Sequence, residues 1–337
     1  MMRNLLNRRD FIKTTAATGL GLSIAGSVFA GNYRPETGKR VGIIGLDTSH
    51  SIAFTKALNA DQPAPEFRGY KVVAAYPYGS KEIRSSADRI PGYIEDMKKF
   101  DVSIVGSIQE LLEEVDVVLL ETNDGRLHLE QALQVFKAGK RMFIDKPIAA
   151  SLSDAVAIFE ASEKYNIPVF SASSLRYIKG ANDLDKSTVI GADTYSPATY
   201  EESHPDLFWY GVHGVESLFT VMGTGCEEVV RITTPDTDVV VGTWEGGRVG
   251  TFRGTRSGKS GYGGTVHTAS GTLPLGPYGG YEPLLVEIIK YFETGQVPVN
   301  PEETLEIFAF MEAADESKRN GGSPVNMQEV LKRAKST

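Results

Sequence analysis

The stretch Arg141-Met142-Phe143-Ile144-Asp145-Lys146-Pro147 predicts an apolar strand that ends on an acid, a lysine and a proline. The apolar triplet indicates a buried strand, and Pro147 ends its ladder because proline has no N–H to donate. Lys146 is therefore expected at a strand's carboxyl end, the edge at which open α/β sheets bind ligands. There a lysine can hydrogen-bond a substrate oxygen or share its proton, although Asp-Lys-Pro alone would also suit a surface lysine.

Strands and helices alternate on both sides of this stretch. The other strands are expected at residues 40–45, 70–76, 102–105, 116–121 and 168–171. Helices are expected between them at 51–59, 107–114, 127–138 and 153–165, and residues 80–90 and 92–100 are expected to be helical or loop-like. The run 116–121 is almost continuously apolar, as expected of a strand covered on both faces. Strands separated by helices in this way predict an α/β fold with a Rossmann-like, doubly wound parallel sheet.

A chain of 337 residues is longer than one core usually holds, so two domains are expected. The first is predicted at residues 38–175 and the second, an α/β substrate and oligomerisation domain, at 176–325. Strand-like alternation in the second domain occurs at residues 193–202, 229–234, 238–244 and 250–256. The helix expected at 283–294 carries an apolar stripe suited to packing back on the first domain.

Composition narrows the class of function. The formal charge of −8 argues against nucleic-acid binding, because no basic surface is available to neutralise phosphates. Cys226 is the single cysteine, which excludes an internal disulfide and a thiolate metal cluster. With 41% hydrophobic and 23% charged residues, the chain resembles an ordinary soluble globular protein.

The N-terminus has the pattern of an export signal. Arg8 and Arg9 precede a small, weakly apolar run from Ala16 to Phe29, and cleavage is expected after Ala30. The twin arginines resemble the signal that exports folded proteins, so residues 1–30 predict a periplasmic protein that can carry a cofactor with it. The run is too short for a comfortable membrane span, and an uncleaved anchor is the alternative.

Six motifs follow one another along the chain: Val41–Gly45, Asp116–Asn123, His128, Ala138–Lys140, Asp145–Pro147 and Arg176–Tyr177. In their order and spacing they resemble the Gfo/Idh/MocA family, named for glucose–fructose oxidoreductase and inositol dehydrogenase. The resemblance implies a Rossmann domain, a second domain with an open, mostly antiparallel sheet, a nicotinamide cofactor, and a sugar or polyol substrate. It also implies a homo-oligomer, and a role for Lys146 beside the nicotinamide and the substrate hydroxyl.

The phosphate loop departs from the dinucleotide fingerprint. Only Gly45 of the three glycines is present, because Asp47 and His50 occupy the other two positions. A carboxylate at Asp47 would repel a diphosphate, or it would simply cap the following helix. Thr48 and Ser49 would still donate hydrogen bonds at the helix N-terminus.

Other cofactor contacts are expected from two further strand ends. Thr122 and Asn123 follow the fourth strand, where the family's loop contacts the nicotinamide ribose, and Asp145 ends the fifth. The second strand ends without an acid, and Lys81 follows it, which favours NADP over NAD if Lys81 is not simply a solvated surface charge.

The segment Phe208–Glu216 is predicted to be a helix with Trp209, His213 and Glu216 on one face. The family resemblance implies that His213 faces the substrate, so Lys146, His213 and Tyr210 are the catalytic candidates. Trp209 stands where relatives carry an aspartate.

A redox-inactive alternative remains open. His213, Glu216 and His204 or His50 would ligate a metal in a lyase or hydrolase acting on an oxidised sugar, or the chain would bind a sugar without catalysis. Residues 254–264, rich in glycine, suit either a loop that closes over substrate or a surface hairpin.

Overall fold

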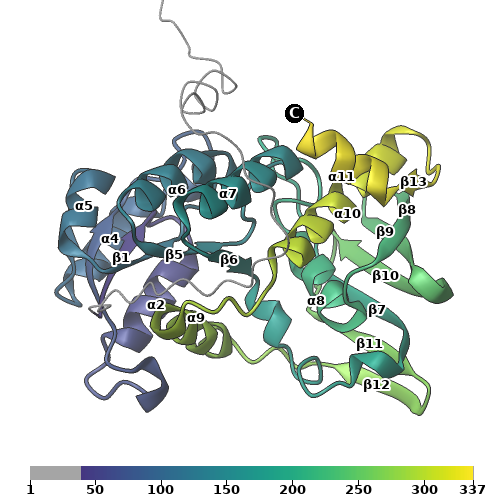
Figure 1. Ribbon diagram of the computed structural model, residues 1–337, viewed down its shortest axis with the longest axis horizontal. Helices are drawn as coiled ribbons and strands as arrows, with labels where there is room; N and C mark the ends of the chain where they lie inside the picture. Colours follow the sequence, from purple (N-terminus) through teal and green to yellow (C-terminus); the bar gives the residue numbers. More distant parts are fainter. Residues whose placement is uncertain (1–38, 337) are drawn as a thin grey trace, which may run out of the picture. The chain divides into compact units, whose positions relative to one another are not determined.

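The computed structural model describes residues 39–336, which form two β-sheets and the helices around them (Figure 1). The predicted signal peptide lies outside the described residues. The first sheet contains β1 (Arg40–Ile44), β2 (Lys71–Tyr76), β3 (Ser103–Ile104), β4 (Val117–Leu120), β5 (Arg141–Asp145) and β6 (Val169–Ala172). Its order is β3-β2-β1-β4-β5-β6 and every pair is parallel, which confirms the doubly wound sheet.

Helices connect these strands as the alternating pattern predicts. They are α2 (Ser49–Leu58), α3 (Arg84–Ala87), α4 (Ile90–Lys98), α5 (Ile108–Glu114), α6 (His128–Lys137) and α7 (Leu152–Tyr165). Local sequence fixes their ends: the Ser151 side chain accepts a hydrogen bond from the Asp154 N–H at the start of α7, and Asn166 ends it in the left-handed conformation. β4 is buried along its whole length, in keeping with its apolar sequence.

The second sheet is mixed. Its strands are β7 (Val189–Pro197), β8 (Cys226–Thr233), β9 (Thr237–Trp244), β10 (Arg248–Thr255), β11 (Gly263–Thr268), β12 (Gly271–Leu275) and β13 (Val325–Asn326), in the order β12-β11-β7-β10-β9-β8-β13. Only β7 and β10 pair in parallel among these described strands. The segment between β10 and β11 is not a hairpin, because β7 lies between those two strands.

The helix α8 (Val212–Met222) packs on β7 and β10 of the second sheet (Figure 1). Its residues are buried throughout. Gly214 allows the close approach, because a Cβ there would lie only 2.3 Å from the Phe252 ring. The helix predicted over residues 208–216 was wrong at its start. The structure begins α8 at Val212, and residues 208–211 form turns before it.

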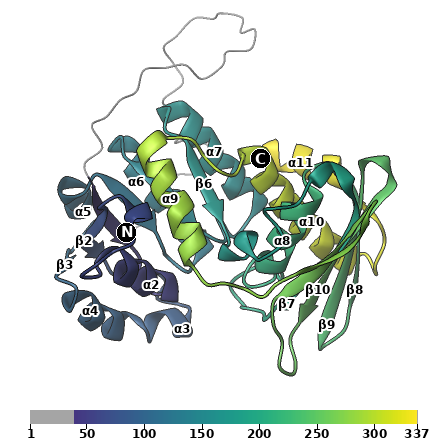
Figure 2. The same cartoon turned by 90° about the horizontal axis from the view of Figure 1, so that it is seen from below.

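The last helices return to earlier parts of the chain (Figure 2). They are α9 (Glu282–Thr294), α10 (Pro301–Arg319) and α11 (Met327–Lys335). Leu285, Ile288 and Phe292 of α9 belong to the same buried cluster as Val41 of β1 and Phe143 of β5. The apolar stripe of α9 thus completes the core of the first sheet.

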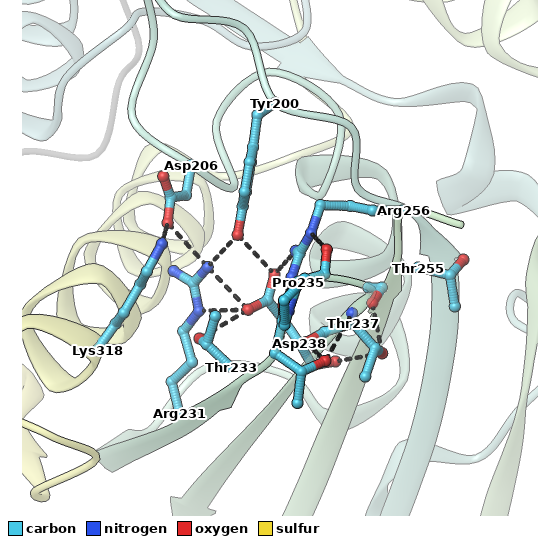
Figure 3. A network of polar contacts seen from close by, with 12 residues as sticks. Tyr200, Asp206, Arg231, Thr233, Pro235, Thr237, Asp238, Thr255, Arg256 and Lys318 are labelled. Carbon is cyan, nitrogen blue, oxygen red and sulfur yellow. Dashed lines mark hydrogen bonds and ion pairs between the residues drawn. The ribbon is translucent and has the colours of Figure 1, made fainter.

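A buried polar network holds the segment between β7 and α8 in place (Figure 3). Arg231 is fully buried, and its guanidinium contacts the carboxylates of Asp238, Asp315 and Asp206. Tyr200 and Asp206 come from that segment, so the network anchors it to β8, β9 and α10.

No helix within residues 39–336 is both long and apolar enough to span a bilayer.

Candidate functional site

The carboxyl ends of β1, β4 and β5 meet at one edge of the first sheet. Gly45 follows β1 with φ +92°, and its N–H donates to the Tyr76 carbonyl. A Cβ at Gly45 would lie 2.5 Å from the Thr122 nitrogen, so the residue after β1 has to be glycine to pass the loop after β4. This crossing brings the predicted cofactor residues Gly45 and Thr122 together.

Asp47 is buried inside this edge and does not cap α2. Its Oδ1 accepts a hydrogen bond from the Asn123 N–H at 2.9 Å, whereas the N-cap position of α2 is Thr48, without a side-chain cap. A Cβ at Gly79 would lie 2.0 Å from Asp47 Oδ2, so the carboxylate is packed against the end of β2 as well. Burial raises the pKa of Asp47 to about 6. The capping interpretation of Asp47 was therefore wrong.

Two hydroxyls near the start of α2 have no protein partner among the described residues. They are Thr48 Oγ1 and Thr122 Oγ1, both buried. Ser49 is more exposed and its hydroxyl lies 3.3 Å from the Tyr281 hydroxyl. Lys81, after β2, is exposed on the surface. Unpaired buried hydroxyls at a helix start are suited to receive polar ligand atoms.

His50, Glu121 and Asp145 form a buried polar group next to these hydroxyls. His50 Nδ1 lies 2.9 Å from Asp145 and 4.0 Å from Glu121 Oε2. Burial and the Asp145 charge raise the pKa of Glu121 well above its ordinary value. Burial alone would raise the pKa of Asp145, but the charges of His50 and Lys146 outweigh it and bring this pKa to about 2. Of the two buried carboxylates, Asp145 is therefore the one that stays ionised.

Lys146 lies at the carboxyl end of β5, as its sequence context predicts, and is half-buried. Within residues 39–336 its ammonium group has no hydrogen bond or ion pair. Its charge nevertheless acts on Asp145 and Glu121 in its own half and on His213 from α8. An ammonium group without an ion-pair partner, close to side chains of both the first sheet and α8, is suited to bind an anionic or partly charged substrate atom.

His213 is buried on α8 and faces the end of β6. Its Nδ1 lies 2.7 Å from Ser173 Oγ, and no described residue hydrogen-bonds its Nε2. Burial, together with the charges of Lys146 and His50, lowers the pKa of His213 well below its ordinary value. The ring is consequently neutral near pH 7 and able to accept a proton.

Tyrosine side chains connect His213 with His50. Tyr281 lies against the His50 ring at 4.4 Å between centroids, and Tyr262 lies 5.9 Å from the His213 ring. Tyr278 lies between these two tyrosines, with centroid distances of 5.8 and 6.3 Å. Tyr210, a predicted catalytic residue, lies 5.2 Å from the His213 ring. The aromatic wall comes from the segment before β11 and the loop before α9, where no sequence motif marked it.

The metal-ligand set considered from the sequence is not brought together. Glu216 accepts from Arg176 Nε at 2.8 Å and from the Ser173 N–H, so its carboxylate is already satisfied. His204 lies 3.6 Å from Asp124, and its ring is tilted against that of Trp209 with 5.0 Å between the centroids. Among residues 39–336, the group whose ligand atoms lie within 4.8 Å of one another is instead His50, Glu121 and Asp145. His128 is packed between the Thr122 and Ile148 carbonyls, as expected of a structural histidine.

Comparison with known proteins agrees with this architecture. Residues 39–173 match the Gfo/Idh/MocA family model, described as an oxidoreductase family with an NAD-binding Rossmann fold. A sequence relative is an uncharacterized oxidoreductase from Streptococcus pneumoniae serotype 4, 26% identical over 156 residues. That match covers 40% of this chain and 42% of the relative's length.

Solved structures extend the similarity to both sheets. A probable dehydrogenase from Thermotoga maritima has a TM-score of 0.70 at 20% identity, over 86% of this chain and 99% of that one. The scyllo-inositol dehydrogenase from Lactobacillus casei, solved with NAD(H) and scyllo-inositol, has a TM-score of 0.67 at 15% identity, with coverage of 86% and 99%. Residues 39–173 are thus similar to the NAD-binding Rossmann fold that the Gfo/Idh/MocA model describes, and the described chain shares the two-sheet fold of these solved structures.

Proposed function

We propose that this chain is an NAD(P)-dependent oxidoreductase that acts on a hydroxyl of a sugar, polyol or glycoside. The observation that carries the proposal is the neighbourhood of Lys146 and His213: an ammonium group without a protein partner acts on a neutral imidazole, whose pKa is lowered by burial first and by that ammonium second. The family match of the first domain supports a nicotinamide cofactor. The similarity in fold to an inositol dehydrogenase supports a polyol-like substrate.

The residues at the sheet edge fit a dinucleotide. Gly45 keeps the β1 end clear of side-chain bulk, and the unpaired hydroxyls of Thr48 and Thr122 would receive its polar atoms, together with Ser49. The Asp47 carboxylate is held by the Asn123 N–H, and its raised pKa reduces the charge that it would set against a phosphate in mildly acidic solution. When bound, the nicotinamide would accept or donate the hydride.

Lys146 would bind the substrate hydroxyl and stabilise negative charge on its oxygen as the proton leaves. Because its ammonium has no partner in the described protein, no existing ion pair has to break when substrate binds. His213 would take up the proton. With a proton on Nδ1 donated to Ser173, the ring presents Nε2 as the acceptor, and its depressed pKa keeps that nitrogen unprotonated.

The tyrosine wall supports a carbohydrate as substrate. Tyr210, Tyr262 and Tyr278 combine apolar ring faces with hydroxyls, and carbohydrate-sized sites combine aromatic walls with a few placed polar groups. Tyr262 and Tyr210 bring their hydroxyls within 3.5 Å of each other, so both are positioned to hydrogen-bond one ligand.

An exposed Lys81 after β2 would interact with a 2′-phosphate and favour NADP.

Two properties of the whole protein belong to the same proposal. The twin-arginine signal in residues 1–30 would export the folded chain, with its cofactor, to the periplasm. The second sheet would pair between subunits, since Ile190, Tyr195 and Val249 expose large apolar side chains on β7 and β10. Light scattering of the purified protein would measure the resulting mass.

The full-length protein, purified from cells that export it, provides the test. We expect bound nicotinamide to be released on denaturation, or titration of NAD(H) and NADP(H) to quench tryptophan fluorescence with saturation. A panel of cyclitols and sugars then identifies the substrate through nicotinamide absorbance. Lys146→Met should lower kcat by about 10²- to 10⁴-fold with the nucleotide affinity preserved, whereas exposed Lys164→Met should leave both unchanged.

Two results would contradict the proposal. One is the absence of saturable nucleotide binding by the folded protein. The other is unchanged turnover in both Lys146→Met and His213→Gln, which would show that neither side chain handles the proton. Changed sugar affinity without any turnover would instead favour the non-catalytic binding alternative.

A further inference from the structure

His50, Glu121 and Asp145 form a buried group of three titratable side chains to which the proposed hydride transfer gives no role. His50 comes from α2, Glu121 follows β4, and Asp145 ends β5, so three separate elements converge on one point. The three side chains are 5%, 0% and 0% exposed. One ligand atom from each lies within 4.8 Å of the others, a spacing that one ion can bridge.

Glu121 supplies an independent observation. Both of its carboxylate oxygens are buried without any hydrogen-bond partner in the described protein, because His50 Nδ1 pairs with Asp145 at 2.9 Å and stays 4.0 Å from Glu121 Oε2. A buried carboxylate left without partners costs stability, and a purely structural acid would be satisfied as Glu216 is by Arg176. Lys146 is near enough to act on Glu121 but makes no ion pair with it. The unpaired oxygens of Glu121 are acceptor atoms that a bound cation would satisfy.

The donor set indicates which cation is suitable. One imidazole nitrogen and two carboxylate oxygens suit first-row divalent metals, for which imidazole is a good ligand. Ca²⁺ would require six to eight oxygen ligands, more than this group offers. We propose that His50, Glu121 and Asp145 bind one divalent first-row metal ion, of the Mn²⁺ or Zn²⁺ kind, at the carboxyl edge of the first sheet.

The position of the ion suggests a role in substrate binding. Asp145 and Lys146 are adjacent in the chain, so the metal would be held next to the lysine that is proposed to bind the substrate hydroxyl. A ligand with two neighbouring oxygens, such as a vicinal diol or a hydroxy acid, would then contact both the ion and the ammonium group. This part rests on the proposed function, whereas binding of the ion does not.

The experiment measures metal binding without substrate or nucleotide, so it stays informative whatever the redox result. Full-length protein stripped with a chelator is titrated with Mn²⁺, and free Mn²⁺ is followed by electron paramagnetic resonance. We expect one site per chain that Zn²⁺ competes for. Glu121→Gln should weaken Mn²⁺ binding by at least about 100-fold, because a charged ligand is lost. Asp116→Asn, an acid just before β4 that pairs with Arg40, lies at the other end of that strand and should bind within about threefold of wild type.

Each outcome decides for or against the site. Absence of saturable Mn²⁺ and Zn²⁺ binding by the wild-type protein up to about 1 mM overturns the proposal and leaves His50 and Asp145 as a plain buried ion pair. Equal binding by wild type and Glu121→Gln overturns it as well. If Glu121→Gln does not fold, as judged by circular dichroism, Asp145→Asn takes its place and must show the same loss of binding.

Discussion

Replacing Glu121 with methionine is expected to stabilise the metal-free protein, even though the glutamate is fully buried. Its carboxylate has no hydrogen-bond partner on either oxygen, and a buried polar group without a partner costs about 1–3 kcal/mol. Methionine fills a similar volume without polar atoms. We therefore expect the free energy of unfolding to rise by about 1–3 kcal/mol.

A matched control comes from a second buried glutamate with the opposite environment. Glu216 is 4% exposed, and Arg176 and the Ser173 N–H satisfy its carboxylate. Glu216→Met removes one partner of a buried ion pair, which costs 3–5 kcal/mol in general. About 3 kcal/mol is expected here, because Glu303 remains 2.7 Å from Arg176 and still compensates part of its charge.

Urea unfolding followed by tryptophan fluorescence, in the presence of a chelator, measures both changes. The denaturant slope should stay constant while the midpoint moves up for Glu121→Met and down for Glu216→Met. Added Mn²⁺ should stabilise the wild type by about 2.7 kcal/mol at 100 times its Kd and leave Glu121→Met unaffected. A loss of stability in chelator-treated Glu121→Met would refute the reasoning, since it would show that the carboxylate makes a stabilising contact.

Three further substitutions test the scaffold around the site. Asp47→Asn should flatten the pH dependence: the folded-state pKa of about 6 lies above 3.8, so the wild type loses about 3 kcal/mol relative to the variant as pH rises from 4 to above 6, measured by urea unfolding at each pH. Gly79→Ala should cost about 1–3 kcal/mol in thermal unfolding, because its Cβ would lie 2.0 Å from Asp47, and an added Asp47→Ala should restore most of it; additive losses would contradict the contact. Arg231→Met should cost about 3–5 kcal/mol, because Asp315 loses its ion-pair partner and Asp238 keeps only Arg256, and a smaller loss would mean that the network relaxes.

The sequence predicted the structure best where the pattern of apolar residues lies within a single strand or helix. Continuous apolar runs predicted β4 and β5, and Pro147 correctly placed Lys146 at a strand end. The spacing of apolar residues in α9 predicted a buried stripe, and the structure confirms it, because those side chains lie in the core of the first sheet. These properties depend on residues close in sequence, so periodicity is enough to find them.

Contacts between distant segments were the part that sequence could not supply. Asp47 was assigned to helix capping or ligand repulsion, yet its partner is the Asn123 N–H from a loop 76 residues away. Glu121 was included only as the end of a strand, because nothing local indicates that His50 and Asp145 converge on it. The start of α8 was placed too early, since the helical spacing of Trp209 and His213 continues a pattern that the backbone does not follow.

The return of α9 to the first sheet has a consequence for how the chain is made. Residues Leu284–Phe292 complete the interior around β1 and β5, yet they are synthesised more than a hundred residues later than β6. A nascent chain ending near residue 175 would expose that apolar surface to water. The amino-terminal half therefore reaches its final state only when nearly the whole polypeptide has been released, and a fragment limited to it would require α9 supplied in trans.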